Sequence, residues 1–382
     1  MDLPGPPYKE NILFNEKESE KEIRRTRNGW KAMKMHMSLT VKKLFIPIGL
    51  SIAAFIFFAA QSENFATASN ISTILRETAT PLMISCGMCF VMAAGYIDLS
   101  VGAMAALISM LASRMIDLGL AIPLILVLMV VLGAIFGFIN GFLIRTFDLH
   151  PFVGTLAMMS VYRGLTWIFS YRNANGSAYA VKITDLTIRE LNGAMNIGSF
   201  KIYYSLIVAL ICMAICQVVF MMTKFGSNIY AMGANLKAAE LTGIKVGRVE
   251  GMAYMCCGAL TGVCAIFLLA RSQCATTTMG VGLEFDAISA LVIGGASAMG
   301  ASETAGKANP VGAALGAFFL YLVYNGIFKM GIPTAYQQIT QGGVLILMMM
   351  VDSIVTMIRL HNQELKYGLE QEKIMQEELN NG

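Results

Sequence analysis

The stretch Gly95-Tyr-Ile-Asp-Leu-Ser-Val-Gly102 decides the fold, because it places a carboxylate, a hydroxyl and two glycines between two long apolar runs. The first run covers residues 80–94 and the second covers 101–111. A charged side chain this close to hydrocarbon costs about 3 kcal/mol or more, so it is retained for a reason. We therefore expect a membrane protein, and we interpret four residues of the stretch as a structural motif: Gly95, Asp98, Ser100 and Gly102.

The composition supports this interpretation. Of the 382 residues, 56% are hydrophobic and only 14% are charged, whereas soluble domains carry about 25% charged residues. The apolar runs have the length of membrane-crossing helices, and the alternation typical of a membrane barrel is absent. The sequence thus predicts an all-α polytopic integral membrane protein with about ten transmembrane helices, at 44–60, 72–94, 99–115, 120–144, 152–170, 203–222, 249–270, 284–299, 310–328 and 336–358. Pro81 and the pair Gly280/Gly282 predict interruptions at the second and the eighth of these.

Charge sets the predicted orientation and the domain boundaries. Most of the 28 lysines and arginines fall on the cytosolic side when the amino terminus is placed in the cytosol. We expect a cytosolic basic tail over 1–43, a transmembrane domain over 44–358 and a cytosolic charged tail over 359–382, in the plasma or inner membrane. Nucleic acid is not an expected partner, because the net charge is only +4 and the basic residues mostly flank apolar runs.

The longest predicted external segment is 171–202. It is polar, and it is predicted to form a short helix between Asp185 and Leu191. Such a segment offers a docking surface for an external partner.

Two pairs of residues suggest an internal repeat. Asp98 is followed by Asn140-Gly141, and Asp286 is followed at a similar spacing by Asn325-Gly326. In the predicted topology the helices that begin at the two aspartates run in opposite directions. The sequence therefore suggests an inverted pseudo-repeat, which is common in transporters.

The loop that follows the sixth predicted span contains a short helix signal. Asn235 is a good N-cap, residues 236–241 favour a helix, and Gly243 is a good stop signal. A helix of about two turns is not stable alone and needs a partner surface. That surface is either a cleft of another protein or the remainder of this chain.

Five stretches of the sequence indicate a protein family: Gly95–Gly102, Pro151–Gly164, Gly233–Gly243, Gly282–Ser297 and Tyr336–Gly342. Taken in this order, they resemble the membrane permease subunit of ribose-type sugar importers of the ATP-binding cassette superfamily. The resemblance covers residues 44–358. One departure is Gly95-Tyr-Ile-Asp, where the family often has Gly-Gly-Ile-Asp, and this leaves the exact sugar open.

The resemblance implies a function and a set of partners. The chain is expected to form the path for a monosaccharide such as ribose, galactose or xylose, as a homodimer in membrane lipid. An external sugar-binding protein is expected to deliver the sugar, and a cytosolic ATPase is expected to bind ATP and Mg, so that this chain needs no cofactor. The residues expected to couple the permease to the ATPase are Asn235, Ala238, Ala239, Glu240, Leu241 and Gly243.

Polar side chains in or beside the spans are candidates for the substrate path, because sugar hydroxyls bond to carboxylates and amides. The alternative is structural, since buried amides often bond to a neighbouring helix, and it is favoured for Asp98, Asn140 and Asn325. The candidates are Asn140, Glu284, Asp286, Asn325, Gln337 and Gln338.

The chain is not expected to be an enzyme. The stretch Gly300–Ala308 lacks the spacing and the Ser or Thr of a phosphate-binding loop, and the three histidines form no cluster with other metal-ligating residues. Two alternatives stay open. One is an ion-coupled secondary transporter that uses Asp98 and Asp286, and the other is a permease of the same superfamily for nucleosides or branched-chain amino acids.

Overall fold

The computed structural model describes residues 44–172, 178–179, 181–183, 185–296 and 308–333, together with scattered positions between 336 and 358. The chain divides into two units, Met1–Ile46 and Pro47–Gly382. Of the first unit, only residues 44–46 are described, so the following account concerns the second. The predicted tails, 1–43 and 359–382, lie outside the described residues.

Among the described residues, seven helices are long and apolar enough to cross a membrane. This confirms the predicted all-α polytopic class. The helices are Leu44–Gln61, α2 (Ala68–Ala93), α4 (Ile122–Thr146), α5 (Pro151–Phe169), α7 (Tyr204–Met222), α10 (Val246–Ser272) and α12 (Pro310–Lys329). Each corresponds to a predicted span.

Two further predicted spans fall on shorter or incompletely described segments. The predicted span 99–115 corresponds to α3 (Val101–Asp117), which has 17 residues and is largely buried. The predicted span 336–358 falls where the structure describes only scattered positions. The number of membrane crossings therefore stays a prediction, and so does the inverted repeat.

The eighth predicted span, 284–299, is wrong as a crossing helix. Within it the structure has α11 (Leu283–Ile293), whose 11 residues reach about 17 Å, roughly half the thickness of the hydrocarbon layer. Ten of these residues are buried, and Gly295, with φ of 94°, follows the end of the helix. Most residues of α11 are apolar because the helix is surrounded by protein. Composition alone does not distinguish such a buried helix from a helix that crosses the membrane.

Helix α2 lies at the centre of the core and does not break at Pro81. It runs without interruption from Ala68 to Ala93. Proline lacks the N–H that would bond to the carbonyl of Glu77. The helix nevertheless continues through Pro81, so the predicted interruption was wrong here. The carbonyl of Pro81 also accepts a hydrogen bond of 2.7 Å from the hydroxyl of Ser85.

Helices α4 and α10 cross at glycines. A Cβ atom added at Gly133 would lie 2.2 Å from the carbonyl oxygen of Gly258, and one added at Gly258 would lie 2.0 Å from that of Gly133. Such close approach of two backbones is typical of helix pairs in membranes, which gain dispersion contacts rather than hydrophobic burial.

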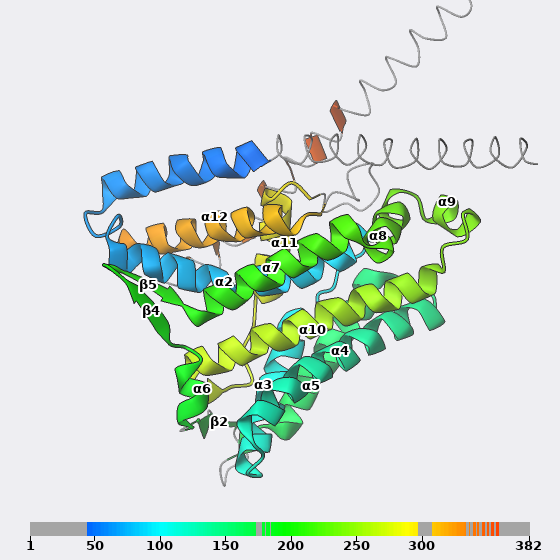
Figure 1. Ribbon diagram of the computed structural model, residues 1–382, viewed down its shortest axis with the longest axis horizontal. Helices are drawn as coiled ribbons and strands as arrows, with labels where there is room; N and C mark the ends of the chain where they lie inside the picture. Colours follow the sequence, from blue (N-terminus) through cyan, green and yellow to red (C-terminus); the bar gives the residue numbers. More distant parts are fainter. Residues whose placement is uncertain are drawn as a thin grey trace, which may run out of the picture. The chain divides into compact units, whose positions relative to one another are not determined.

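Short elements gather at the two ends of α7 and α10 (Figure 1). At one end lie α6 (Leu186–Glu190), whose N-cap Asp185 accepts from two backbone N–H groups, and the hairpin of β4 (Ala194–Ile197) and β5 (Phe200–Tyr203). This confirms the short helix predicted in the segment 171–202. The same segment pairs β1 (Tyr171–Arg172) with β2 (Ala178–Tyr179), and β3 (Val181–Lys182) pairs with β6 (Cys274–Ala275).

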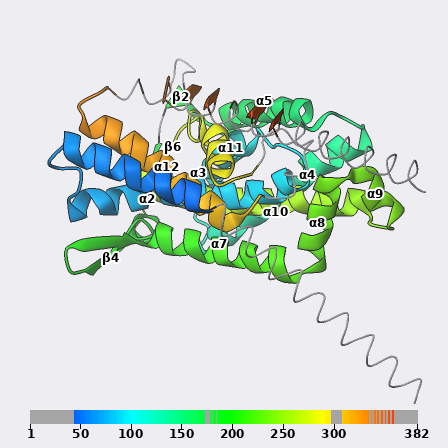
Figure 2. The ribbon, with the colours of Figure 1, turned by 90° about the horizontal axis from the view of Figure 1, so that it is seen from above.

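The opposite end of α7 carries α8 (Lys224–Ala234) and α9 (Leu236–Leu241) (Figures 1 and 2). Helix α7 has 19 residues and is therefore about 28 Å long. We call the end of α7 that carries β4 and β5 the hairpin end, and we call the end that carries α8 and α9 the α9 end.

Candidate functional site

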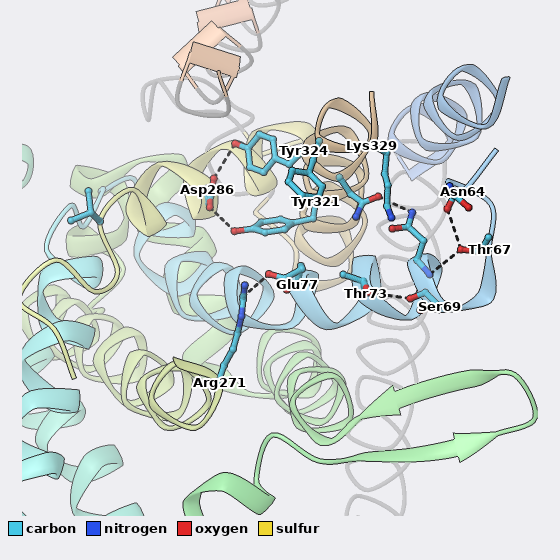
Figure 3. Close-up of a pocket in the computed structure, with 14 residues that line it drawn as sticks. Asn64, Thr67, Ser69, Thr73, Glu77, Arg271, Asp286, Tyr321, Tyr324 and Lys329 are labelled. Carbon is cyan, nitrogen blue, oxygen red and sulfur yellow. Dashed lines mark hydrogen bonds and ion pairs between the residues drawn. The ribbon is translucent and has the colours of Figure 1, made fainter. Parts of the chain in front are cut away.

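A cavity of about 650 Å³ lies at the hairpin end, between the first turns of α2, the last turns of α12 and the end of α10. Figure 3 shows the polar side chains that project into it from these helices. The lining residues are Asn64, Thr67, Ser69, Asn70, Thr73, Glu77, Arg271, Val281, Asp286, Tyr321, Tyr324, Asn325, Phe328 and Lys329. We call this cavity the polar pocket.

Asp286 lies in the first turn of α11, where the helix dipole favours a carboxylate. Its side chain is 5% exposed. The hydroxyl of Tyr321 donates to Oδ2 at 2.8 Å, and that of Tyr324 donates to Oδ1 at 3.1 Å. The two tyrosines, from α12, thus hold the carboxylate at the wall of the polar pocket (Figure 3).

Asn325 links α12 to the beginning of α2. Its Oδ1 accepts a hydrogen bond of 2.8 Å from Nδ2 of Asn70, and this Nδ2 also donates to the carbonyl of Phe65 at 2.9 Å. The amide of Asn70 was not among the predicted site residues.

An ion pair between α10 and α2 forms another wall of the polar pocket. Nη1 of Arg271, at the end of α10, lies 2.5 Å from Oε2 of Glu77 on α2, and Arg76 contacts the other carboxylate oxygen at 3.0 Å. The charge of Glu77 is therefore neutralised by two arginines. Sequence reasoning missed Glu77 and Arg271, although a signal existed: Asn70, Thr73 and Glu77 are spaced so that they share one face of a helix.

Asp98 and Asn140 belong to a second, separate network. Oδ1 of Asp98 accepts from the N–H and the hydroxyl of Ser100 at 2.8 and 2.7 Å. Nδ2 of Asn140 donates to Ser100 Oγ at 2.8 Å, and the hydroxyl of Tyr162 donates to Asn140 Oδ1 at 2.8 Å. None of these four residues lines the polar pocket, and all four are buried. Of the motif glycines, Gly95 has φ of 91°.

Glu284 lies beside Gly102 of the same motif. Its Oε1 accepts from the N–H of Gly282 at 3.3 Å, and a Cβ atom added at Gly102 would lie 2.2 Å from its Oε2. Glu284 is buried and does not line the polar pocket. Of the four predicted path residues that the structure describes, it therefore brings Asp286 and Asn325 together in one cavity and leaves Asn140 and Glu284 outside it. Gln337 and Gln338 lie outside the described residues.

The short helix α9 has the bounds and caps that the sequence predicts. Oδ1 of Asn235 accepts from the N–H of Ala238 at 3.0 Å, and Gly243 has φ of 85°. Ala239 is buried against this chain, whereas Leu241 is 90% exposed. Glu240 lies 3.7 Å from Arg145 at the end of α4. Helix α9 thus rests on its own chain through Ala239 and presents Leu241 outward.

Comparison with known proteins places these features in a family. Residues 70–349 match the family described as the branched-chain amino acid transport system / permease component. The chain is 35% identical to the ribose import permease protein RbsC of Bacillus subtilis over 319 residues, which are 84% of this chain and 95% of that protein. It is 32% identical to the L-arabinose ABC transporter permease protein AraH of Azospirillum brasilense, over 80% of this chain and 86% of that protein.

A third relative is more distant. The galactose/methyl galactoside import permease protein MglC of Haemophilus influenzae is 27% identical, over 77% of this chain and 89% of that protein. No solved structure shows a significant match.

Proposed function

Since this chain belongs to the family described as the branched-chain amino acid transport system / permease component, we propose that it forms the membrane path of an ATP-driven importer for a monosaccharide such as ribose, galactose or xylose. The observation that carries the proposal is the polar pocket, in which Asp286, Asn325 and two tyrosines come together. The printed names of the curated relatives, for ribose, arabinose and galactose, support the sugar class.

The chemistry of the polar pocket suits a neutral polyol. Its volume of about 650 Å³ falls in the range of small-molecule sites. The carboxylate of Asp286 accepts from sugar hydroxyls, and the amides of Asn70 and Asn325 both donate and accept. The charged residues of the lining are two carboxylates, Glu77 and Asp286, and two cations, Arg271 and Lys329, so their formal charges balance and the polar pocket offers hydrogen bonds without a strong demand for a charged ligand.

The proposed orientation places the polar pocket on the outer side of the membrane. With the amino terminus in the cytosol, the hairpin end faces outward, and the polar pocket is the first site that an incoming sugar meets. An external sugar-binding protein then releases its sugar above the polar pocket, against the segment 171–202.

The α9 end faces the cytosol in this orientation and receives the ATPase. The exposed Leu241 inserts into a cleft of the ATPase, which itself holds ATP and Mg. Two copies of this chain assemble as a homodimer, each with its own polar pocket. Closure of the ATPases moves α9, and the population shifts from outward-open to inward-open states. This chain performs no covalent step.

Transport into proteoliposomes tests the proposal. The chain is reconstituted with its cognate ATPase and sugar-binding protein, and uptake of labelled ribose, galactose, xylose, leucine and a nucleoside is measured. We expect ATP-dependent uptake of one of the sugars. Uptake of leucine or the nucleoside instead would reassign the substrate within the superfamily, and sugar uptake driven by an ion gradient without ATP would establish the ion-coupled alternative.

A further inference from the structure

The hairpin β4–β5 is amphipathic. Directly paired residues of an antiparallel ribbon share a face, and the register pairs Met195 with Ile202 and Ile197 with Phe200. One face is therefore wholly apolar. The pairs Ala194 with Tyr203 and Asn196 with Lys201 form the other, more polar face.

Three of the four residues on the apolar face are exposed in the part of the chain that the structure describes, and Ile202 is half-buried. Met195, Ile197 and Phe200 are 46%, 55% and 44% exposed. An isolated two-stranded ribbon is at best marginally stable in water. We therefore expect the exposed apolar residues to be covered by lipid or by another protein.

The ribbon is nevertheless fixed to the helices along one edge. The N–H of Lys201 donates to Oγ of Ser72 on α2 at 2.9 Å, and the guanidinium of Arg76 lies 4.9 Å from the centre of the Tyr203 ring. Gly198, with φ of 59°, takes the first position of the tight turn, as a two-residue hairpin loop requires. The backbone of Lys201 and the ring of Tyr203 thus hold β5 against α2, whereas Met195, Ile197 and Phe200 on the apolar face stay exposed.

The length of α7 fixes the depth of the hairpin. Helix α7 begins at Tyr204, directly after β5, and its 19 residues cross about 28 Å, close to the full thickness of the hydrocarbon layer. Its outward residues Ile211, Ile215 and Val218 are more than half exposed, which is typical of a face toward lipid. The hairpin extends directly from the end of α7 (Figures 1 and 2), so a membrane crossed by α7 would have its surface at the level of the hairpin.

We propose that the apolar face of the β4–β5 hairpin inserts into the boundary between headgroups and acyl chains of the leaflet at the hairpin end, with Asn196 and Lys201 turned toward water. The occupant of this face is the lipid bilayer. Because β5 is bonded to Ser72, beside the polar pocket residues Asn70 and Thr73, the hairpin anchors the mouth of the polar pocket to the membrane surface. The proposal rests on α7 crossing the membrane and not on which solute is carried.

Tryptophan quenching in lipid vesicles tests the proposal. The native Trp30 and Trp167 are replaced by Phe, and a single tryptophan is introduced by Ile197→Trp on the apolar face or by Asn196→Trp on the polar face. The two positions are neighbours in sequence and both are exposed, so they form a matched pair. Phe200→Trp and Lys201→Trp give a second pair if one of the first variants does not fold. Each protein is reconstituted into phosphatidylcholine brominated near the top of the acyl chains.

We expect lipid quenching at Ile197→Trp and Phe200→Trp that is at least about twofold stronger than at Asn196→Trp and Lys201→Trp, and the reverse order for aqueous iodide. Equal quenching by lipid within each pair would overturn the proposal. So would stronger iodide quenching at the apolar positions, since it would place that face in water, free for an external protein. Neither readout depends on transport, so the result is separate from the fate of the proposed function.

Discussion

The hydroxyl of Tyr321 donates a hydrogen bond of 2.8 Å to the carboxylate of Asp286, and so joins the middle of α12 to the first turn of α11. Tyr324, one turn later on α12, bonds to the other oxygen of the same carboxylate. The polar pocket therefore has one wall whose charged group is held in place before any ligand enters. Such a preformed acceptor recognises hydroxyls at a low cost in conformational entropy.

Tyr321→Phe removes a hydrogen bond that orients Asp286. We expect weaker sugar uptake at low sugar concentration, about three- to tenfold, because Asp286 keeps its charge but loses its fixed orientation. The concentration dependence of uptake in proteoliposomes measures this. Tyr204→Phe, at an exposed tyrosine that does not line the polar pocket, is the control. Unchanged uptake in Tyr321→Phe would remove Asp286 from the proposed path.

Asn325→Ala and Asn140→Ala are expected to fail in different ways. Asn140→Ala removes the amide that bonds to the hydroxyls of Ser100 and Tyr162 in a buried network. Ser100 still donates to Asp98, and Tyr162 still donates to the carbonyl of Phe136, so the cost is about 1 kcal/mol for each lost hydrogen bond. The expected result is a lower unfolding temperature in detergent, with an unchanged sugar dependence for the protein that remains folded. Asn325→Ala, in the polar pocket, is expected to change the sugar dependence more than the unfolding temperature. The opposite pattern would exchange the two roles.

Leu241→Glu and Ala239→Glu separate docking from folding at α9. Leu241 is exposed, so the charge leaves the permease stable but disrupts an apolar contact with the ATPase, and ATP hydrolysis should no longer drive uptake. Ala239 is buried, so a charge there should also loosen α9 from its own chain. Co-purification of the ATPase and the unfolding temperature are measured for both. Normal uptake by Leu241→Glu would contradict a docking role for α9.

Gly258→Val tests the crossing of α4 and α10. A Cβ atom at Gly258 would lie 2.0 Å from the carbonyl oxygen of Gly133, so the helices must separate, at a cost of about 3 kcal/mol or more. We expect little monodisperse protein on size-exclusion chromatography. Gly164→Val is the control, because no atom lies within 4 Å of a Cβ added at Gly164. Equal yields of the two variants would show that the crossing tolerates side chains.

Local features could be predicted from the sequence because they depend on neighbouring residues. Helix α9 begins after Asn235 and ends before Gly243, since a side-chain cap and a left-handed glycine act within one turn. Helix α6 follows Asp185 for the same reason. The long apolar helices were equally readable, because backbone groups in lipid must bond within their own helix.

The tertiary structure alone decided which apolar and polar residues face protein. Apolar residues in α11 and in α7 look alike in sequence, but most of α11 is enclosed by protein and is too short to cross, whereas the exposed residues of α7 face outward. The polar pocket joins Asn70, Glu77, Arg271 and Asn325 from three helices that are far apart in the chain. Hydropathy gives the transfer free energy of each residue but does not say which helix covers it. Only long-range packing therefore decides that Asp286 lies in the polar pocket and that Asn140 lies in a buried hydrogen-bond network.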